Sequence, residues 1–61
     1  MEVKEIIPNL NRYVLFEGST YLLKGGIIRK DENGKIYYSA ELLDKNERSI
    51  LYAKLEKVKL R

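Results

Sequence analysis

The side chains that could do chemistry in this 61-residue chain are carboxylates, lysines, arginines, tyrosines and hydroxyls, because the sequence contains neither histidine nor cysteine. The commonest proton shuttle at neutral pH is therefore missing, and so is the thiolate that serves as a nucleophile and a zinc ligand. A serine nucleophile would need a base within hydrogen-bonding reach, and no local motif supplies one. The sequence accordingly predicts no catalytic residues, no enzymatic activity and no cofactor.

One run of oxygen-bearing side chains, Asp31-Glu32-Asn33-Gly34, offers ligands that a cation could use. The spacing of a calcium-binding loop is absent, however, whereas Asn-Gly is a strong signal for the tight turn of a β-hairpin. The pair Gly25-Gly26 likewise lacks the spacing of a phosphate-binding loop. We therefore expect a turn at the first position, a bulge or bend at the second, and no metal site.

A basic surface could bind an anionic partner, and charge is unevenly distributed along the chain. Residues 1–44 carry six basic and seven acidic side chains, a net charge of −1, whereas residues 45–61 carry six basic and two acidic, a net charge of +4. Small β-barrels often bind nucleic acid with a basic groove and stacking aromatic residues. The residues of this nucleic-acid hypothesis are Lys54, Lys57, Lys59, Arg61 and Tyr52. The alternative is a charged surface that only keeps the protein soluble.

These side chains must be positioned by strands, and the clearest prediction is a hairpin of residues 20–30 and 35–44 around Asn33-Gly34. Both arms are rich in Tyr, Ile and Leu, which favour half-buried strands. A loop of two or four residues would direct one alternating set of side chains toward the core. That set is Tyr21, Leu23, Gly25, Ile27, Ile36, Tyr38, Ala40 and Leu42. An earlier hairpin, of residues 12–16 and 20–23, is predicted around Glu17-Gly18-Ser19.

The opposite face of the long hairpin is too apolar for a fully solvated surface. Either the curl of a small barrel or the Ile6-Ile7 segment covers it, or it binds a protein partner or a second copy of the chain. The residues of this protein-interaction hypothesis are Leu22, Ile28, Tyr37 and Leu43.

The last fifteen residues fit two structures. Four apolar residues, Ile50, Leu51, Leu55 and Val58, form one stripe of a helix over residues 47–59. In the competing interpretation, two strands of opposite side-chain phase are separated by a one-turn 3₁₀ segment near residues 54–56, which buries Leu55. We favour the two strands.

The ending Ile50-Leu-Tyr-Ala-Lys-Leu-Glu-Lys-Val-Lys-Leu60 resembles that of an SH3-like barrel, with a strand, a 3₁₀ turn and a closing strand. The resemblance covers about residues 12–60 and implies an all-β fold, a small five-stranded SH3-like barrel or an open antiparallel meander. Residues 1–11 would form an N-terminal arm or a short edge strand, and residues 12–61 the single domain. The paired tryptophan of signalling SH3 domains is absent, so binding of proline-rich peptides is not implied.

The predicted function is a small non-enzymatic binding module of unknown ligand, with nucleic-acid binding by the basic C-terminal strand as the alternative. No apolar run approaches the roughly 20 residues that span a membrane. Residues 1–5 show no basic cluster followed by an apolar stretch. We therefore predict a cytoplasmic location without a membrane partner.

Overall fold

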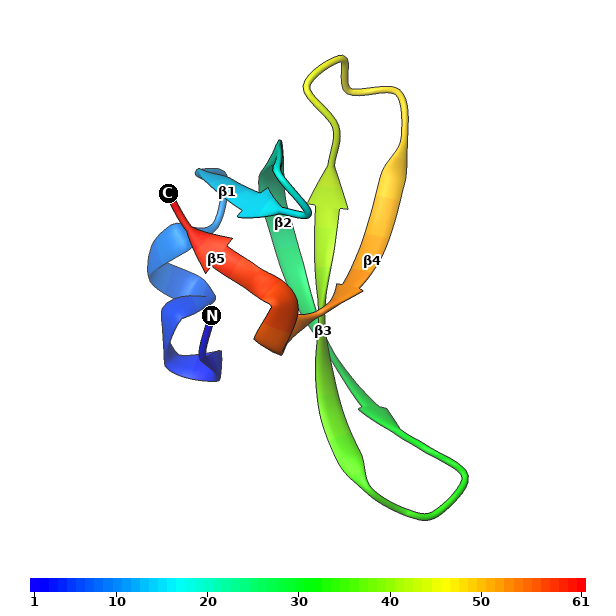
Figure 1. The fold of residues 1–61 in the computed structure, drawn as a ribbon. Coiled ribbons are helices and arrows are strands. Elements are labelled where there is room, and N and C mark those ends of the chain that lie inside the picture. The colour runs from blue at the N-terminus through cyan, green and yellow to red at the C-terminus, as the bar shows by residue number, and fades with distance from the viewer.

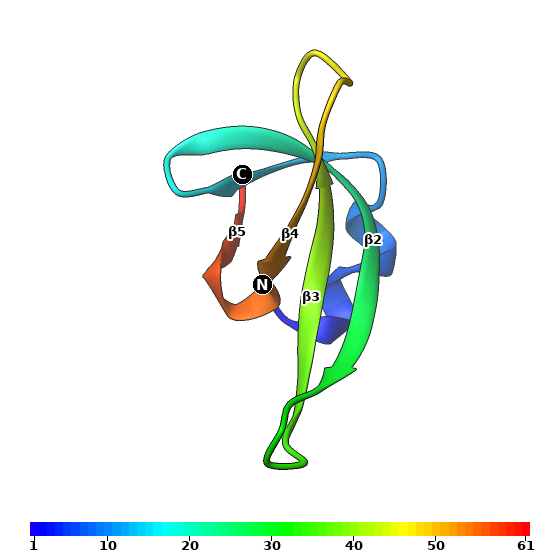
Figure 2. The ribbon, with the colours of Figure 1, turned by 90° about the vertical axis from the view of Figure 1, so that its right-hand side faces the viewer.

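The computed structural model describes residues 1–61 and contains one five-stranded antiparallel sheet. The strands lie in the order β4-β3-β2-β1-β5, and the two end strands are not paired with each other, so the curved sheet stays open (Figures 1 and 2). The strand bounds are Tyr13–Phe16 (β1), Ser19–Lys30 (β2), Ile36–Leu43 (β3), Ile50–Lys54 (β4) and Val58–Leu60 (β5). The predicted all-β, open antiparallel architecture is confirmed. No helix is long and apolar enough to cross a membrane.

The predicted long hairpin is confirmed, and its distal end projects beyond the rest of the sheet (Figure 1). Its loop has five residues, 31–35, instead of the expected two or four, and only Gly34 has a positive φ there (82°). The carboxylate of Asp31 accepts hydrogen bonds from the backbone amides of Asn33 and Lys35, each 2.9 Å long. This side chain organises the wider loop in place of a tight Asn-Gly turn.

A β-bulge at Lys24 reverses the side-chain phase of β2, because the register with β3 shifts between Leu23 and Gly25. Leu23 keeps the predicted core orientation. Beyond the bulge the prediction is wrong: Gly25 and Ile27 leave the core face, and Ile28 joins it. A slip of one residue exchanges the two faces of a strand. The expected interruption of this strand exists, immediately before the glycine pair.

The first hairpin joins β1 to β2 through a two-residue turn, Glu17-Gly18, with Phe16 paired to Ser19. Both turn residues have positive φ, 49° and 77°, as a type I′ turn requires. That conformation is strained for glutamate, which has a Cβ. The hairpin therefore forms although the backbone of Glu17 is strained in its turn.

The tail contains two strands separated by a 3₁₀ turn, so the helical alternative over residues 47–59 is wrong. The turn, η3, spans Leu55–Lys57, one residue later than predicted. Leu55 is buried at 4% exposure, as expected, and Val58 returns to the core on β5. Leu60 pairs with Val14 at the end of β5 and stays 43% exposed.

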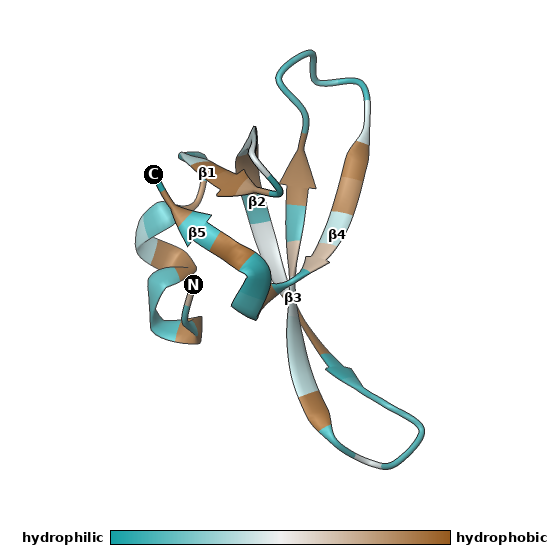
Figure 3. Cartoon of the chain, in the orientation of Figure 1, coloured by the Kyte–Doolittle hydropathy of each residue, from teal (hydrophilic) through white to brown (hydrophobic).

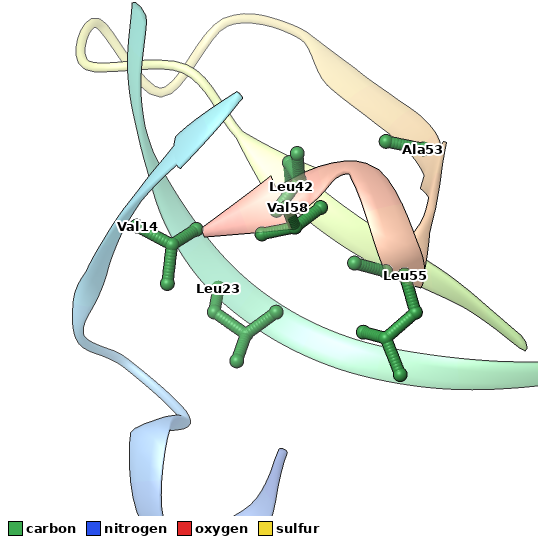
Figure 4. Close-up of a cluster of buried hydrophobic side chains, with 7 residues drawn as sticks. Val14, Leu23, Leu42, Ala53, Leu55 and Val58 are labelled. Atoms are coloured by element: carbon green, nitrogen blue, oxygen red, sulfur yellow. The ribbon is translucent and has the colours of Figure 1, made fainter. Parts of the chain in front are cut away.

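The core lies on the concave inner face of the sheet and is small. Its seven buried apolar residues are Val14, Leu23, Ala40, Leu42, Ala53, Leu55 and Val58, which approach one another from all five strands and η3 (Figure 4). Ile36 was predicted to face this core, but it is 51% exposed because it lies near the tip of the projecting hairpin. Burial of each large side chain stabilises the fold by roughly 1.5–3 kcal/mol. Because the core is small, losing any one of these side chains removes a large share of that stabilisation.

The N-terminal residues form two 3₁₀ turns, η1 (Val3–Glu5) and η2 (Ile7–Asn9), and not an edge strand. The amino group of Met1 donates hydrogen bonds to the carbonyls of Leu55 and Val58. Ile6 packs against the core, and its Cδ1 lies 2.7 Å from the place where a Cβ on Gly26 would be. The N-terminal segment therefore closes one open side of the core.

Candidate binding surface on the outer face of the sheet

The outer face of β2, β3 and β4 is the convex side of the sheet, opposite the core. Side chains alternate between the faces of a strand, and the buried residues Leu23, Leu42 and Ala53 fix which set points inward. The outward positions are Leu22, Gly25, Ile27 and Arg29 on β2, Tyr37, Ser39, Glu41 and Leu43 on β3, and Ile50, Tyr52 and Lys54 on β4.

Two cations and two tyrosines meet at the hairpin end of this face, and we call Arg29, Tyr37, Tyr52 and Lys54 the aromatic–cationic cluster. The guanidinium carbon of Arg29 lies 6.0 Å from the ring centre of Tyr52, and the ammonium nitrogen of Lys54 lies 5.7 Å from that of Tyr37. An exposed contact of this kind contributes about 0.5–1 kcal/mol. Both contacts are therefore weak enough for a ligand to displace.

A small residue, Ser39, makes this arrangement possible. Ser39 lies in the middle of the cluster, paired with Ile27 on one side and Lys54 on the other, and it is buried at 5% exposure. With a hydroxymethyl group at this position, the long side chain of Arg29 can extend across β3 toward β4. A larger residue at position 39 would stand between Arg29 and Tyr52.

The electrostatics of the cluster favour an anionic ligand. The one ion pair in the structure joins Lys4 to Glu2, so neither Arg29 nor Lys54 has a carboxylate within 4.0 Å. Glu41 is the single acidic residue among the outward positions. Its carboxylate accepts a 3.4 Å hydrogen bond from the Tyr52 hydroxyl. Both cations keep donors free for an incoming acceptor.

The other end of the outer face carries an apolar row, which consists of Tyr13, Leu22, Leu43 and Ile50. Each residue is the register partner of the next, so the row crosses four adjacent strands from β1 to β4. Tyr13 and Ile50, at its ends, are 48% and 54% exposed. Figure 3 shows hydrophobic colour at the end of β3 and at the start of β4, which carry Leu43 and Ile50.

The structure divides the residues of the nucleic-acid hypothesis. Tyr52 and Lys54 lie in the aromatic–cationic cluster, whereas Lys57 lies on η3, outside any strand. Lys59 is paired with Leu15 at the β5 end of the sheet, with three strands between it and β4. Arg61 lies near Arg12, at a shallow hollow beside η2. Lys57, Lys59 and Arg61 therefore do not share one strand, because Lys57 lies on η3 and β5 ends at Leu60.

The protein-interaction residues are also divided. Leu22, Tyr37 and Leu43 lie on the outer face as predicted, but Ile28 does not, because the bulge turns it to the inner side, where it is 70% exposed on the projecting hairpin. The Ile6-Ile7 segment does not cover the outer face: Ile6 packs against the core.

Sequence reasoning missed Arg29, Ser39, Tyr13 and Ile50 as members of this surface. Placing the bulge at Lys24 would have found Arg29, since it alternates with Gly25 and Ile27 on the corrected face. Tyr13 and Ile50 follow from the pairing of β1 and β4 with the hairpin, and no local signal in the sequence fixes that register.

A groove of about 660 Å³ lies between the N-terminal residues, the distal part of the projecting hairpin and η3. Tyr37 and Lys54 line it on one side, so it borders the aromatic–cationic cluster. The other charged residues of its wall, Glu2, Asp31, Lys35 and Glu56, are mostly acidic. No group of three or more carboxylates is placed to hold a metal ion.

Comparisons with protein-family models, with curated proteins and with solved structures find no match to this chain.

Proposed function

We propose that this chain is a small non-enzymatic binding module and that the outer face of β2, β3 and β4 is its binding surface. One observation carries the proposal: on this face two cations without carboxylate partners lie over two tyrosine rings, beside a row of half-exposed apolar residues. Exposed aromatic and cationic side chains gathered on one rigid sheet are typical of recognition surfaces.

The fold that we propose for this module is an SH3-like half-open barrel. Its support is the order of the last three elements. Strand β4 is followed by the 3₁₀ turn with buried Leu55 and then by the closing strand β5, which pairs with β1. Such a scaffold says nothing about the ligand, which must be argued from the site. The non-enzymatic part rests on the lack of histidine and cysteine. A cytoplasmic location remains a prediction.

The alternative is nucleic-acid binding by the basic C-terminal strand, and it shares two of its residues with the proposed surface. Tyr52 and Lys54 belong to the proposed surface, whereas Lys59 lies at the other end of the sheet. A ligand on the outer face would contact the first two and leave Lys59 free. Binding on the outer face and binding by the C-terminal strand therefore involve different surfaces of the sheet.

Mapping by NMR tests the proposed surface. Amide shifts of the ¹⁵N-labelled protein would be followed while a single-stranded oligonucleotide is added, and separately while the protein itself is concentrated. Perturbed amides that cluster on residues 22–29, 37–43 and 50–54 in either titration would support the proposal. Perturbations centred on Leu15 and Lys59, or none in both titrations, would contradict it.

A further inference from the structure

We infer that the aromatic–cationic cluster binds single-stranded nucleic acid, with bases stacked on Tyr37 and Tyr52 and phosphates held by Arg29 and Lys54. The inference rests on the proposed function, because it names the ligand class of that same outer face. It moves the predicted nucleic-acid interface from the C-terminal strand to the outer face of β2, β3 and β4.

The two rings are spaced along one face as a strand-like ligand needs. Tyr52 is the register partner of Glu41, which lies four positions from Tyr37 on β3. Four strand residues correspond to roughly 13 Å along the sheet. One ligand strand can therefore reach both rings, with intervening nucleotides passing over the small Ser39.

Each tyrosine already has a cation over its ring, and that pairing suggests how a nucleotide is received. A base stacks on the aromatic ring, and the cation that lay over the ring turns to the neighbouring phosphate. Stacking on aromatic residues tolerates any base, because every base has a π-face. The cation loses a weak exposed contact and gains a charge-assisted hydrogen bond.

The cluster fits a chain of phosphates and unpaired bases better than an apolar peptide, because it combines two cations without carboxylate partners and two aromatic rings. Arg29 can contact a phosphate through two parallel donors, whereas Lys54 acts as a compact charge. Glu41 is held by the Tyr52 hydroxyl at the border of the cluster. A duplex hides the faces of its bases inside the stack, so the tyrosines could stack only on unpaired nucleotides.

The test is the affinity of the full chain for a fluorescent single-stranded oligonucleotide of about ten nucleotides, measured by anisotropy at low salt. We expect saturable binding that is tighter than binding to a duplex of the same sequence. The affinity should fall linearly with salt on logarithmic axes. Replacing Arg29 or Lys54 by Gln should lower that slope by about 0.7 for each lost phosphate contact.

Matched variants separate stacking from folding. Tyr52→Leu should weaken binding by about tenfold or more through the loss of one stacked base, whereas Tyr52→Phe, which keeps the ring, should bind within about twofold of the wild type. Lys59→Gln, which removes one positive charge at the other end of the sheet, should also bind within about twofold. Dispersed amide spectra would verify that each variant is folded.

Absence of binding at low salt would overturn the inference, and so would equal losses in Tyr52→Phe and Tyr52→Leu, or a larger loss in Lys59→Gln than in Lys54→Gln. The proposed function would survive those results if shifts on the outer face appear as the protein is concentrated. If they do not, both fail.

Discussion

Alternate residues of β2, β3 and β4 build two faces that differ in size, chemistry and exposure. The inner face combines small residues such as Ala40 and Ala53 with buried leucines, and it closes on η3 and the N-terminal segment. The outer face carries the aromatic–cationic cluster, in which Arg29 lies over the ring of Tyr52 and Lys54 lies over that of Tyr37. Since neighbours in sequence lie on opposite faces, substitutions one residue apart should separate stability from binding.

The largest effect is expected from Leu42→Ala compared with Leu43→Ala. Leu42 is fully buried, and removing its side chain should cost about 2–5 kcal/mol through lost burial and the cavity left behind. A domain of this size has only about 3–5 kcal/mol in total, so most of this variant should be unfolded. Leu43 lies outward, and its variant should keep a cooperative transition in urea, followed by circular dichroism. Equal losses would contradict the assignment of faces.

Leu55→Ala should resemble Leu42→Ala, because Leu55 is buried at 4% exposure where η3 closes the core. Its neighbour Lys54 points outward, so Lys54→Ala should change the free energy of unfolding by no more than about 0.5 kcal/mol. Thermal melts of both variants would check this difference. A large loss in Lys54→Ala would show that the cluster is needed for folding.

Gly26→Ala should cost about 1 kcal/mol or more, because the added Cβ would lie 2.7 Å from Cδ1 of Ile6. The clash involves a side-chain end, so a partner substitution can relieve it. In a double-mutant cycle with Ile6→Val, the two substitutions together should cost less than the sum of the single ones. Additive losses would show that Ile6 of the N-terminal segment does not pack against Gly26 of β2.

Glu17→Asn should raise the free energy of unfolding by about 0.5–1 kcal/mol. The turn requires positive φ at Glu17 and Gly18, and asparagine adopts that conformation more readily than glutamate. The substitution lies far from the aromatic–cationic cluster, so oligonucleotide affinity should not change. A destabilised variant, measured by urea unfolding, would contradict the type I′ assignment.

Ile50→Thr is expected to have the smallest effect, and it compares the two ends of the outer face. Ile50 is 54% exposed on an edge strand, and threonine keeps the β-branched shape that strands favour. Stability should change by less than about 0.5 kcal/mol, and oligonucleotide affinity should stay within about twofold. A loss of affinity equal to that of Tyr52→Leu would mean that the apolar row, and not the cluster, holds the ligand.

The sequence predicted those elements whose determinants are local. Alternating apolar residues and a Gly-containing loop located the long hairpin, and the change of phase after Ala53 located the 3₁₀ turn that buries Leu55. The bulge lies at Lys24, whereas the sequence predicted it at Gly25-Gly26. Lysine carries no bulge signal, but glycine within a strand does. One extra residue reverses the face of every side chain that follows it along the strand. Because the bulge was misplaced, the prediction did not include Arg29 in the outer face.

The candidate site was less predictable than the fold. Tyr37, Tyr52 and Lys54 were all singled out, but for two different hypotheses, since their proximity depends on the pairing of β3 with β4. Lys57 and Lys59 were grouped with Tyr52 and Lys54 by sequence spacing alone. Lys57 lies on η3, and Lys59 lies on β5, at the other end of the sheet from β4. Non-local register assembled the cluster, and spacing along the chain cannot supply it.

The central claim is that nucleotides stack on the outer face, and intermolecular NOEs test it most directly. In a complex of the labelled protein with a single-stranded oligonucleotide, base protons should show NOEs to the ring protons of Tyr37 and Tyr52. Those ring protons should also shift upfield. NOEs from the bases to Leu15 and Lys59, or to Tyr13 and Ile50, with none to Tyr37 or Tyr52, would contradict the claim.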